Sequence, residues 1–201
     1  MHSSEARDFF VRGFERRRAM AILRGYPAEQ TLEYASAAWS AGLALVEVPL
    51  QNSRSAEALG RCARAASEQG QIVGAGTITS RELVEQAAEL GARFTVAPGF
   101  DPDVAAHSLA CGMPHLPGVA TATEVQRASA AGFEWQKAFP AAELGAGWIT
   151  AMHGPFPQLR FVATGGISAQ NAQQFLAAGA AAVSFGAAFA DLGPDELSSL
   201  S

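Results

Sequence analysis

The chain has 201 residues, of which 49% are hydrophobic and 16% charged, and its formal net charge is −5. A chain of this length can bury roughly 70% of its unfolded surface in one core, which excludes intrinsic disorder. The acidic balance excludes a nucleic-acid-binding surface, and we interpret the short basic run at residues 16–18 as a solvated helix end. Cys62 and Cys111 are too few for a disulfide framework. With no apolar membrane span or signal sequence, we expect a cytoplasmic protein.

Apolar β-rich runs alternate with alanine-rich helical patterns along almost the whole chain. The first segment, about residues 4–17, is amphipathic and is predicted to form a helix that covers one end of the fold. The predicted strands are 19–23, 43–48, 72–75, 93–97, 114–116, 134–138, 160–163 and 182–185. The predicted helices lie near 28–41, 54–69, 80–90, 101–110, 121–131, 145–152 and 168–178. The glycines expected to end helices are Gly42, Gly70, Gly91, Gly112, Gly132 and Gly179.

Strict alternation of strand and helix predicts a parallel sheet with right-handed crossovers, either open and doubly wound or closed into a barrel. Eight units of about 21 residues fit a closed barrel near the lower size limit of that fold, roughly 200 residues. We therefore predict an α/β protein of the (β/α)8 TIM-barrel class, with a single domain over residues 1–201. The barrel is expected over about 18–190, followed by an irregular tail.

Lys137 is the only lysine in a chain that has 13 arginines. Alternation along the sixth predicted strand places Trp135, Lys137 and Phe139 on one face, so an inward orientation would surround the amine with apolar rings. Burial lowers the pKa of a lysine and makes its amine a nucleophile toward a ketone, a role that arginine cannot take. The alternative is a surface lysine near a strand end.

Glu47 lies inside the apolar second strand, in the sequence LVEVPL. A buried carboxylate must be paired or functional, because an unpaired charge in an apolar interior is strongly unfavourable. One interpretation is an ion pair with Arg24, at the end of the neighbouring strand. The other, compatible with the first, is a general acid/base beside a Schiff base. Arg24 could also clamp a carboxylate in bidentate fashion.

The turns after the seventh and eighth strands, TGGIS (164–168) and FGAA (185–188), stand where many barrels bind phosphate through backbone N–H groups. Such a turn is also a common tight connection without any ligand. The segment GAGT (74–77) lacks the third glycine of a dinucleotide fingerprint, so no NAD site is predicted. The four histidines have no metal-ligand spacing, so no metal site is predicted.

Eight short motifs follow one another between residues 21 and 186. They are AILRG (21–25), VEVPL (46–50), VGAGT (73–77), APGFDP (97–102), LPGVATATE (116–124), KAFPA (137–141), GPFPQLRFVATGGIS (154–168) and FG (185–186). In this order they resemble the 2-keto-3-deoxy-6-phosphogluconate (KDPG) and 4-hydroxy-2-oxoglutarate (KHG) aldolases, together with the related 2-keto-3-deoxy-6-phosphogalactonate aldolases. The resemblance covers about residues 20–190. It implies a (β/α)8 class I aldolase that forms a homotrimer, needs no metal or other cofactor, and acts on a small molecule.

The resemblance also implies roles for individual residues. Lys137 would form the Schiff base with the ketone of the pyruvyl group, and Glu47 would be the general acid/base. Thr77 would hold the pyruvate carboxylate, and backbone groups of the glycines would hold a phosphate. The expected substrate contacts are Arg24, Gln51, Thr77, Thr164, Gly165, Gly166, Gly186 and Ala187.

Two positions depart from the family pattern. Gln51 stands where the phosphogluconate branch has an arginine and favours the phosphogalactonate branch, whereas residues 154–168 favour the phosphogluconate branch. Ala187 and Ala188 replace a serine of the phosphate loop, a loss of about 1 kcal/mol in phosphate binding. The predicted reaction is reversible cleavage of a 2-keto-3-deoxy-6-phospho sugar acid to pyruvate and glyceraldehyde 3-phosphate, with 4-hydroxy-2-oxoglutarate as a further substrate. The alternatives are a phosphate-binding barrel isomerase or epimerase, and a ligand-binding paralogue without activity.

Overall fold

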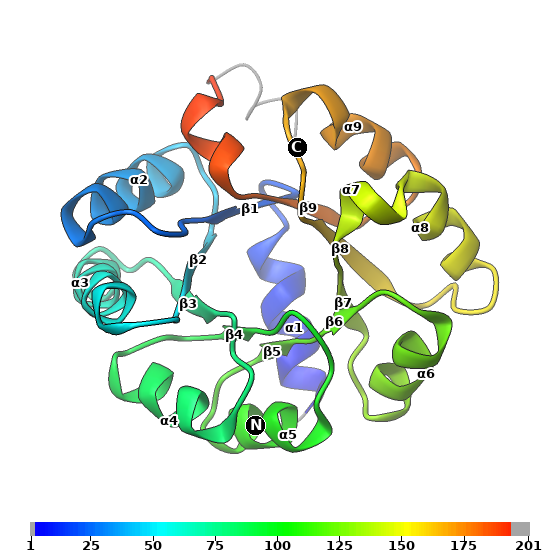
Figure 1. Ribbon diagram of the computed structural model, residues 1–201, viewed down its shortest axis with the longest axis horizontal. Helices are drawn as coiled ribbons and strands as arrows, with labels where there is room; N and C mark the ends of the chain where they lie inside the picture. The colour runs from blue at the N-terminus through cyan, green and yellow to red at the C-terminus, as the bar shows by residue number, and fades with distance from the viewer. Residues whose placement is uncertain (1–2, 194–201) are drawn as a thin grey trace.

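A computed structural model describes residues 3–193 of the chain (Figure 1). The strands of this part are β1 (Ala19–Ile22), β2 (Leu45–Pro49), β3 (Val73–Gly76), β4 (Thr95–Val96), β5 (His115–Leu116), β6 (Gly118–Val119), β7 (Trp135–Ala138), β8 (Arg160–Thr164) and β9 (Ala182–Phe185). The helices are α1 (Ser3–Gly13), α2 (Ala28–Ser40), α3 (Ser53–Glu68), α4 (Arg81–Glu89), α5 (Pro102–Ala110), α6 (Ala122–Ala130), α7 (Ala141–Leu144), α8 (Ala146–His153), α9 (Ala169–Ala177) and the 3₁₀ helix η1 (Ala187–Asp191).

The strands form one parallel sheet in the order β5-β4-β3-β2-β1-β9-β8-β7-β6. Only Pro117 separates β5 from β6, so the two ends of the sheet adjoin and the sheet closes into a barrel surrounded by helices (Figure 1). The predicted (β/α)8 barrel is confirmed. Where the sequence predicts one strand at 114–116, the structure has two short strands, β5 and β6, on either side of Pro117. The strand is interrupted there because proline has no N–H to donate to the hydrogen bonds between strands. The carbonyl of Pro117 still accepts a hydrogen bond from the Lys137 backbone N–H, at 2.8 Å.

The helix ends follow the glycine pattern of the sequence. The six glycines predicted to end helices all have positive φ, between 65° and 105°, a conformation that glycine adopts at little cost. The predicted helix 145–152 is extended by a separate turn, α7, which Gly145 divides from α8. That turn and η1 were not expected from the sequence, and the predicted tail beyond residue 193 lies outside the described residues.

The N-terminal helix is shorter than predicted, because α1 ends at Gly13 instead of extending to residue 17. The interpretation of residues 16–18 as a solvated helix end is wrong. The Arg18 guanidinium donates hydrogen bonds to the carbonyls of Ala180 and Ala181, at 2.5 and 2.9 Å. These bonds tie the segment between α1 and β1 to the start of β9, so the chain enters the barrel there and does not continue as a helix.

Two apolar clusters divide the core. The larger cluster lies between the sheet and the outer helices. The smaller one fills the barrel interior with Met20, Ile22, Leu45, Phe94, Val96, Leu116, Trp135, Val162 and Ala182, and adds Phe10 and Phe14 from the α1 segment. The Phe14 ring stacks on Trp135 with the ring centroids 5.2 Å apart. As predicted, α1 covers one end of the barrel (Figure 1), and the polar side chains of the interior lie toward the carboxyl ends of the strands.

Candidate active site

Lys137 and Glu47 face the barrel interior from β7 and β2. Each lies two residues after a member of the interior cluster, Trp135 or Leu45, and side chains two apart on a strand share a face. Lys137 is 4% exposed and Glu47 is 0% exposed. The inward orientation predicted for Lys137 is confirmed, and the alternative of a surface lysine is excluded.

The surroundings of Lys137 favour its neutral amine. The Nζ atom lies 5.0 Å from the centroid of the Phe139 ring, a cation–π contact that by itself favours the charged form. Burial lowers the pKa of Lys137, the negative charge of Glu47 opposes this shift, and the Arg24 guanidinium adds to it. A lowered pKa increases the fraction of the neutral amine, which is the form of a lysine that can attack a ketone.

Glu47 is a buried carboxyl, and neither of its oxygens has a hydrogen-bond partner among residues 3–193. Burial raises its pKa, while the charges of Lys137 and Arg24 oppose that shift. Within residues 3–193, neither cation comes within 4.0 Å of the carboxylate as an ion pair, so the predicted Arg24–Glu47 pair is not formed. A buried lysine with a lowered pKa and a buried carboxyl with a raised pKa in one barrel interior are the kind of perturbed groups that gather at functional sites.

Gly76 provides the space that the Glu47 carboxylate occupies. A Cβ atom at Gly76 would lie 1.8 Å from Glu47 Oε1 and 2.5 Å from its Cδ. The residues meet because β2 and β3 are neighbours, with Glu47 opposite Gly74 and Pro49 opposite Gly76. The sequence has no local signal for this role, because the contact depends on a side chain of the neighbouring strand.

Three predicted substrate contacts are connected by hydrogen bonds at the carboxyl ends of β1, β2 and β3. Arg24 Nη1 donates to Gln51 Oε1 at 2.7 Å, and Arg24 Nη2 donates to Thr77 Oγ1 at 3.4 Å. Thr77 has a φ of 61°, a left-handed conformation that is uncommon for a β-branched residue. Backbone strain of this kind often occurs at functional sites.

The other predicted contacts lie at the ends of β8 and β9, which pair through Thr164 and Ser184. Thr164 is 2% exposed. Gly165 and Gly166 have positive φ, and a Cβ at either would crowd Phe139 or α7. Their glycine identity therefore has a structural reason in addition to the predicted phosphate role.

Gly186 is different, because a Cβ there would meet no atom of the described residues 3–193 within 4 Å. Packing therefore does not require a glycine at this position. Ala187 follows it as an exposed residue at the start of η1.

Comparison with known proteins agrees with this geometry. A family model described as KDPG and KHG aldolase matches residues 13–197. The chain belongs to this family. A 2-dehydro-3-deoxy-phosphogluconate aldolase from Treponema pallidum is 36% identical over 164 residues, which cover 81% of this chain and 77% of that protein. A probable 2-dehydro-3-deoxy-6-phosphogalactonate aldolase from Rhizobium meliloti is 37% identical over 164 residues, covering 80% and 76%.

The solved structures show the same fold. The 2-keto-3-deoxy-6-phosphogluconate aldolase of Zymomonas mobilis ZM4 has a TM-score of 0.81 at 29% identity, covering 92% of this chain and 93% of that structure. The resemblance predicted from the motifs is confirmed. The protein is an aldolase, and therefore a lyase.

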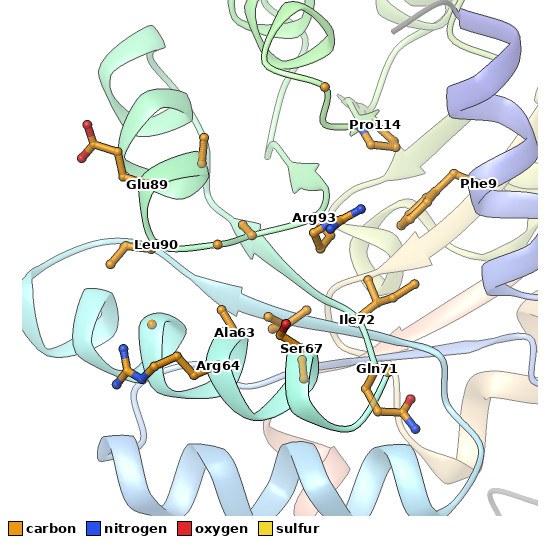
Figure 2. Close-up of a pocket in the computed structure, with 18 residues that line it drawn as sticks. Phe9, Ala63, Arg64, Ser67, Gln71, Ile72, Glu89, Leu90, Arg93 and Pro114 are labelled. Carbon is orange, nitrogen blue, oxygen red and sulfur yellow. The ribbon is translucent and has the colours of Figure 1, made fainter.

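The cavity of this aldolase in Figure 2, about 870 Å³, has neither Lys137 nor Glu47 in its lining. It opens between α3 and α4 near the amino-terminal ends of β3 and β4, and its lining includes Phe9, Arg64 and Arg93 (Figure 2). A smaller cavity of about 300 Å³ includes Gln51 in its lining and adjoins the site. The candidate active site is therefore identified by its chemical groups and not by the volume of the larger cavity.

Two further findings concern residues 3–193. This part of the chain holds no group of three or more His, Cys, Asp or Glu side chains arranged to bind a metal ion. None of its helices combines the length and the apolar character needed to cross a membrane.

Proposed function

We propose that this aldolase reversibly cleaves a 2-keto-3-deoxy-6-phospho sugar acid to pyruvate and glyceraldehyde 3-phosphate, through a Schiff base on Lys137. The observation that carries the proposal is the buried Lys137 amine, which shares the barrel interior with the buried and unpartnered carboxyl of Glu47. The relatives named above act on the phosphogluconate or the phosphogalactonate compound, and this chain is similar to both.

The chemistry assigns one role to each group. The neutral Lys137 amine attacks carbon 2 of the substrate, and loss of water gives an iminium ion. Glu47 removes the proton of the carbon-4 hydroxyl, the bond between carbons 3 and 4 breaks, and its electron pair moves into the iminium to form an enamine. The aldehyde leaves. The Glu47 carboxylic acid then protonates carbon 3, and hydrolysis releases pyruvate and restores the amine.

The substrate is held at both ends in this proposal. Thr77 and Arg24 receive the carboxylate of the pyruvyl half, since Arg24 donates toward Thr77. Backbone N–H groups of Gly165, Gly166 and Gly186 receive the phosphate. The open surroundings of Gly186 support this arrangement, because a ligand can approach its backbone closely.

The hydroxyl missing at Ala187 and Ala188 weakens phosphate binding and favours 4-hydroxy-2-oxoglutarate as a further substrate, which would yield pyruvate and glyoxylate. Cleavage assays with the gluconate and galactonate epimers, with and without phosphate, and with 4-hydroxy-2-oxoglutarate would establish the preference. If the rates do not depend on the phosphate, the proposed phosphate contacts are wrong.

The Schiff base is tested by Lys137→Arg and by reduction with borohydride in the presence of pyruvate. We expect the variant to lose turnover while keeping the thermal unfolding of the wild type, because arginine does not deprotonate in proteins. Since the chain has no other lysine, the reduced pyruvyl group should appear by mass spectrometry on the peptide that contains Lys137. Wild-type turnover in the variant, or no adduct on that peptide, would refute the mechanism.

We also propose that the aldolase is a cytoplasmic homotrimer, as the family resemblance implies. Sedimentation equilibrium should then give about three times the chain mass of 20.9 kDa. The mass of a single chain would contradict the trimer.

A further inference from the structure

Gln51 occupies a central position in the hydrogen-bonded group at the ends of β1, β2 and β3. Its side-chain oxygen accepts the short bond from Arg24, whose other terminal nitrogen donates to Thr77. An arginine can only donate hydrogen bonds, so the amide oxygen of Gln51 must face it. Gln51 and Thr77 therefore hold the guanidinium from two sides.

The backbone of Gln51 is itself anchored. Its N–H donates to Ser55 Oγ at 2.8 Å, and Ser55 belongs to the capping box that starts α3. The Asn52 side chain and Ser55 satisfy each other's backbone groups within that box. The helix start thus fixes the point from which Gln51 reaches Arg24.

An amide holds a guanidinium without neutralising it. Within residues 3–193, Arg24 has no carboxylate within 4.0 Å, so it keeps its full charge at the mouth of the barrel. That charge acts on both Lys137 and Glu47. A glutamate in place of Gln51 would have nearly the same shape but would cancel the charge.

We propose that Gln51 is a positioning residue, which holds the charged Arg24 guanidinium beside Thr77 for the carboxylate of a 2-keto acid. This inference rests on the proposed aldolase function and adds to it the residue that holds Arg24 in place for the carboxylate. Gln51 itself acts through Arg24 and not through the reacting atoms.

The test compares Gln51→Glu and Gln51→Met with the wild type. The assay is the exchange of the methyl protons of pyruvate for deuterium, followed by NMR, because the enamine forms from pyruvate alone. Pyruvamide, which has the ketone but no carboxylate, is the control substrate. Gln69→Glu is the control variant, since it adds the same charge beyond the opposite end of α3, at an exposed position.

We expect both Gln51 variants to raise the KM for pyruvate about tenfold or more, because each removes or neutralises a charge-assisted contact. The KM for pyruvamide should change by less than about twofold in both variants.

The charged groups that act on Lys137 are Glu47 and Arg24. In Gln51→Glu the added carboxylate offsets the effect of Arg24, so the acidic limb of the pH–rate profile should move to higher pH. In Gln51→Met this shift should be much smaller.

The outcomes separate the inference from the function on which it rests. If the wild type neither exchanges pyruvate protons nor forms the borohydride adduct on Lys137, the proposed function fails. If the wild type does both, but Gln51→Glu and Gln51→Met keep its KM and pH profile, the role of Gln51 is refuted. An equal rise in KM for pyruvate and pyruvamide, or the same effect in Gln69→Glu, would also refute it.

Discussion

Gly76→Ala tests whether the position of the Glu47 carboxylate governs the rate. Gly76 lies in β3 and does not have a positive φ, so the backbone accepts alanine without strain. The added methyl group would lie 1.8 Å from Glu47 Oε1, whereas ordinary van der Waals contact begins at 3.4 Å. The carboxylate must therefore move by about 1.6 Å, the difference between these distances.

A displacement of about 1 Å in a catalytic group can reduce a rate about 100-fold. We therefore expect kcat for cleavage to fall about 100-fold in Gly76→Ala, measured by coupling pyruvate release to lactate dehydrogenase. The borohydride adduct on Lys137 should still form on long incubation, because the lysine itself is not displaced.

Gly74→Ala is the matched control on the same strand. The three atoms nearest to a Cβ at Gly74 would belong to the Phe94 ring, at 2.5 Å, whereas the nearest atoms to a Cβ at Gly76 belong to Glu47. Overpacking should destabilise this variant by about 1–3 kcal/mol, while its kcat at a temperature where it is folded stays within about threefold of the wild type. A Gly76→Ala enzyme with a wild-type kcat, or a Gly74→Ala enzyme with an equal loss, would refute the reasoning.

Two further predictions concern stability. Burial lowers the pKa of His115 to about 4 from 6.5, so below pH 6.5 the unfolded chain binds a proton that the folded chain does not. The free energy of unfolding should fall by up to about 3 kcal/mol as the pH drops from about 6.5 to about 4. In denaturant titrations, the unfolding free energy of His115→Gln should depend less on pH than that of the wild type. The same pH dependence in both proteins would contradict this prediction. Arg18→Ala should lose about 1–3 kcal/mol through its two carbonyl contacts, whereas Arg16→Ala, at an exposed position, should be nearly neutral in the same titrations.

The sequence predicted the structure correctly where a short repeating pattern of residues determines the direction of the side chains. The two-residue alternation of a strand placed Lys137 beside Phe139 and on the face of Trp135, and the structure has this arrangement. Glu47 was expected to be buried because it lies within an apolar strand, and its side chain is fully buried. Helix ends were predictable because glycine adopts a positive φ more easily than other residues. The interruption at Pro117 was missed, although it also has a local cause.

The contacts between strands could not be predicted in the same way. The 1.8 Å approach of a Gly76 Cβ to Glu47, and the hydrogen bonds that join Arg24 to Gln51 and Thr77, depend on which strands are neighbours and in which register. The Arg24–Glu47 ion pair was expected because the strands are adjacent, but the guanidinium reaches the polar barrel mouth, where binding an amide avoids the cost of burying a charge.

The sequence by itself therefore determined the barrel, the family and the single lysine available for a Schiff base, because side-chain alternation, glycine punctuation and residue chemistry are properties of short segments. Only the tertiary structure decided how the carboxyl ends of the strands meet. It placed Glu47 against Gly76 and Arg24 between Gln51 and Thr77, because the pairing of β1 with β2 and of β2 with β3 brings together residues that are about 25 to 50 positions apart in the chain and fixes their register.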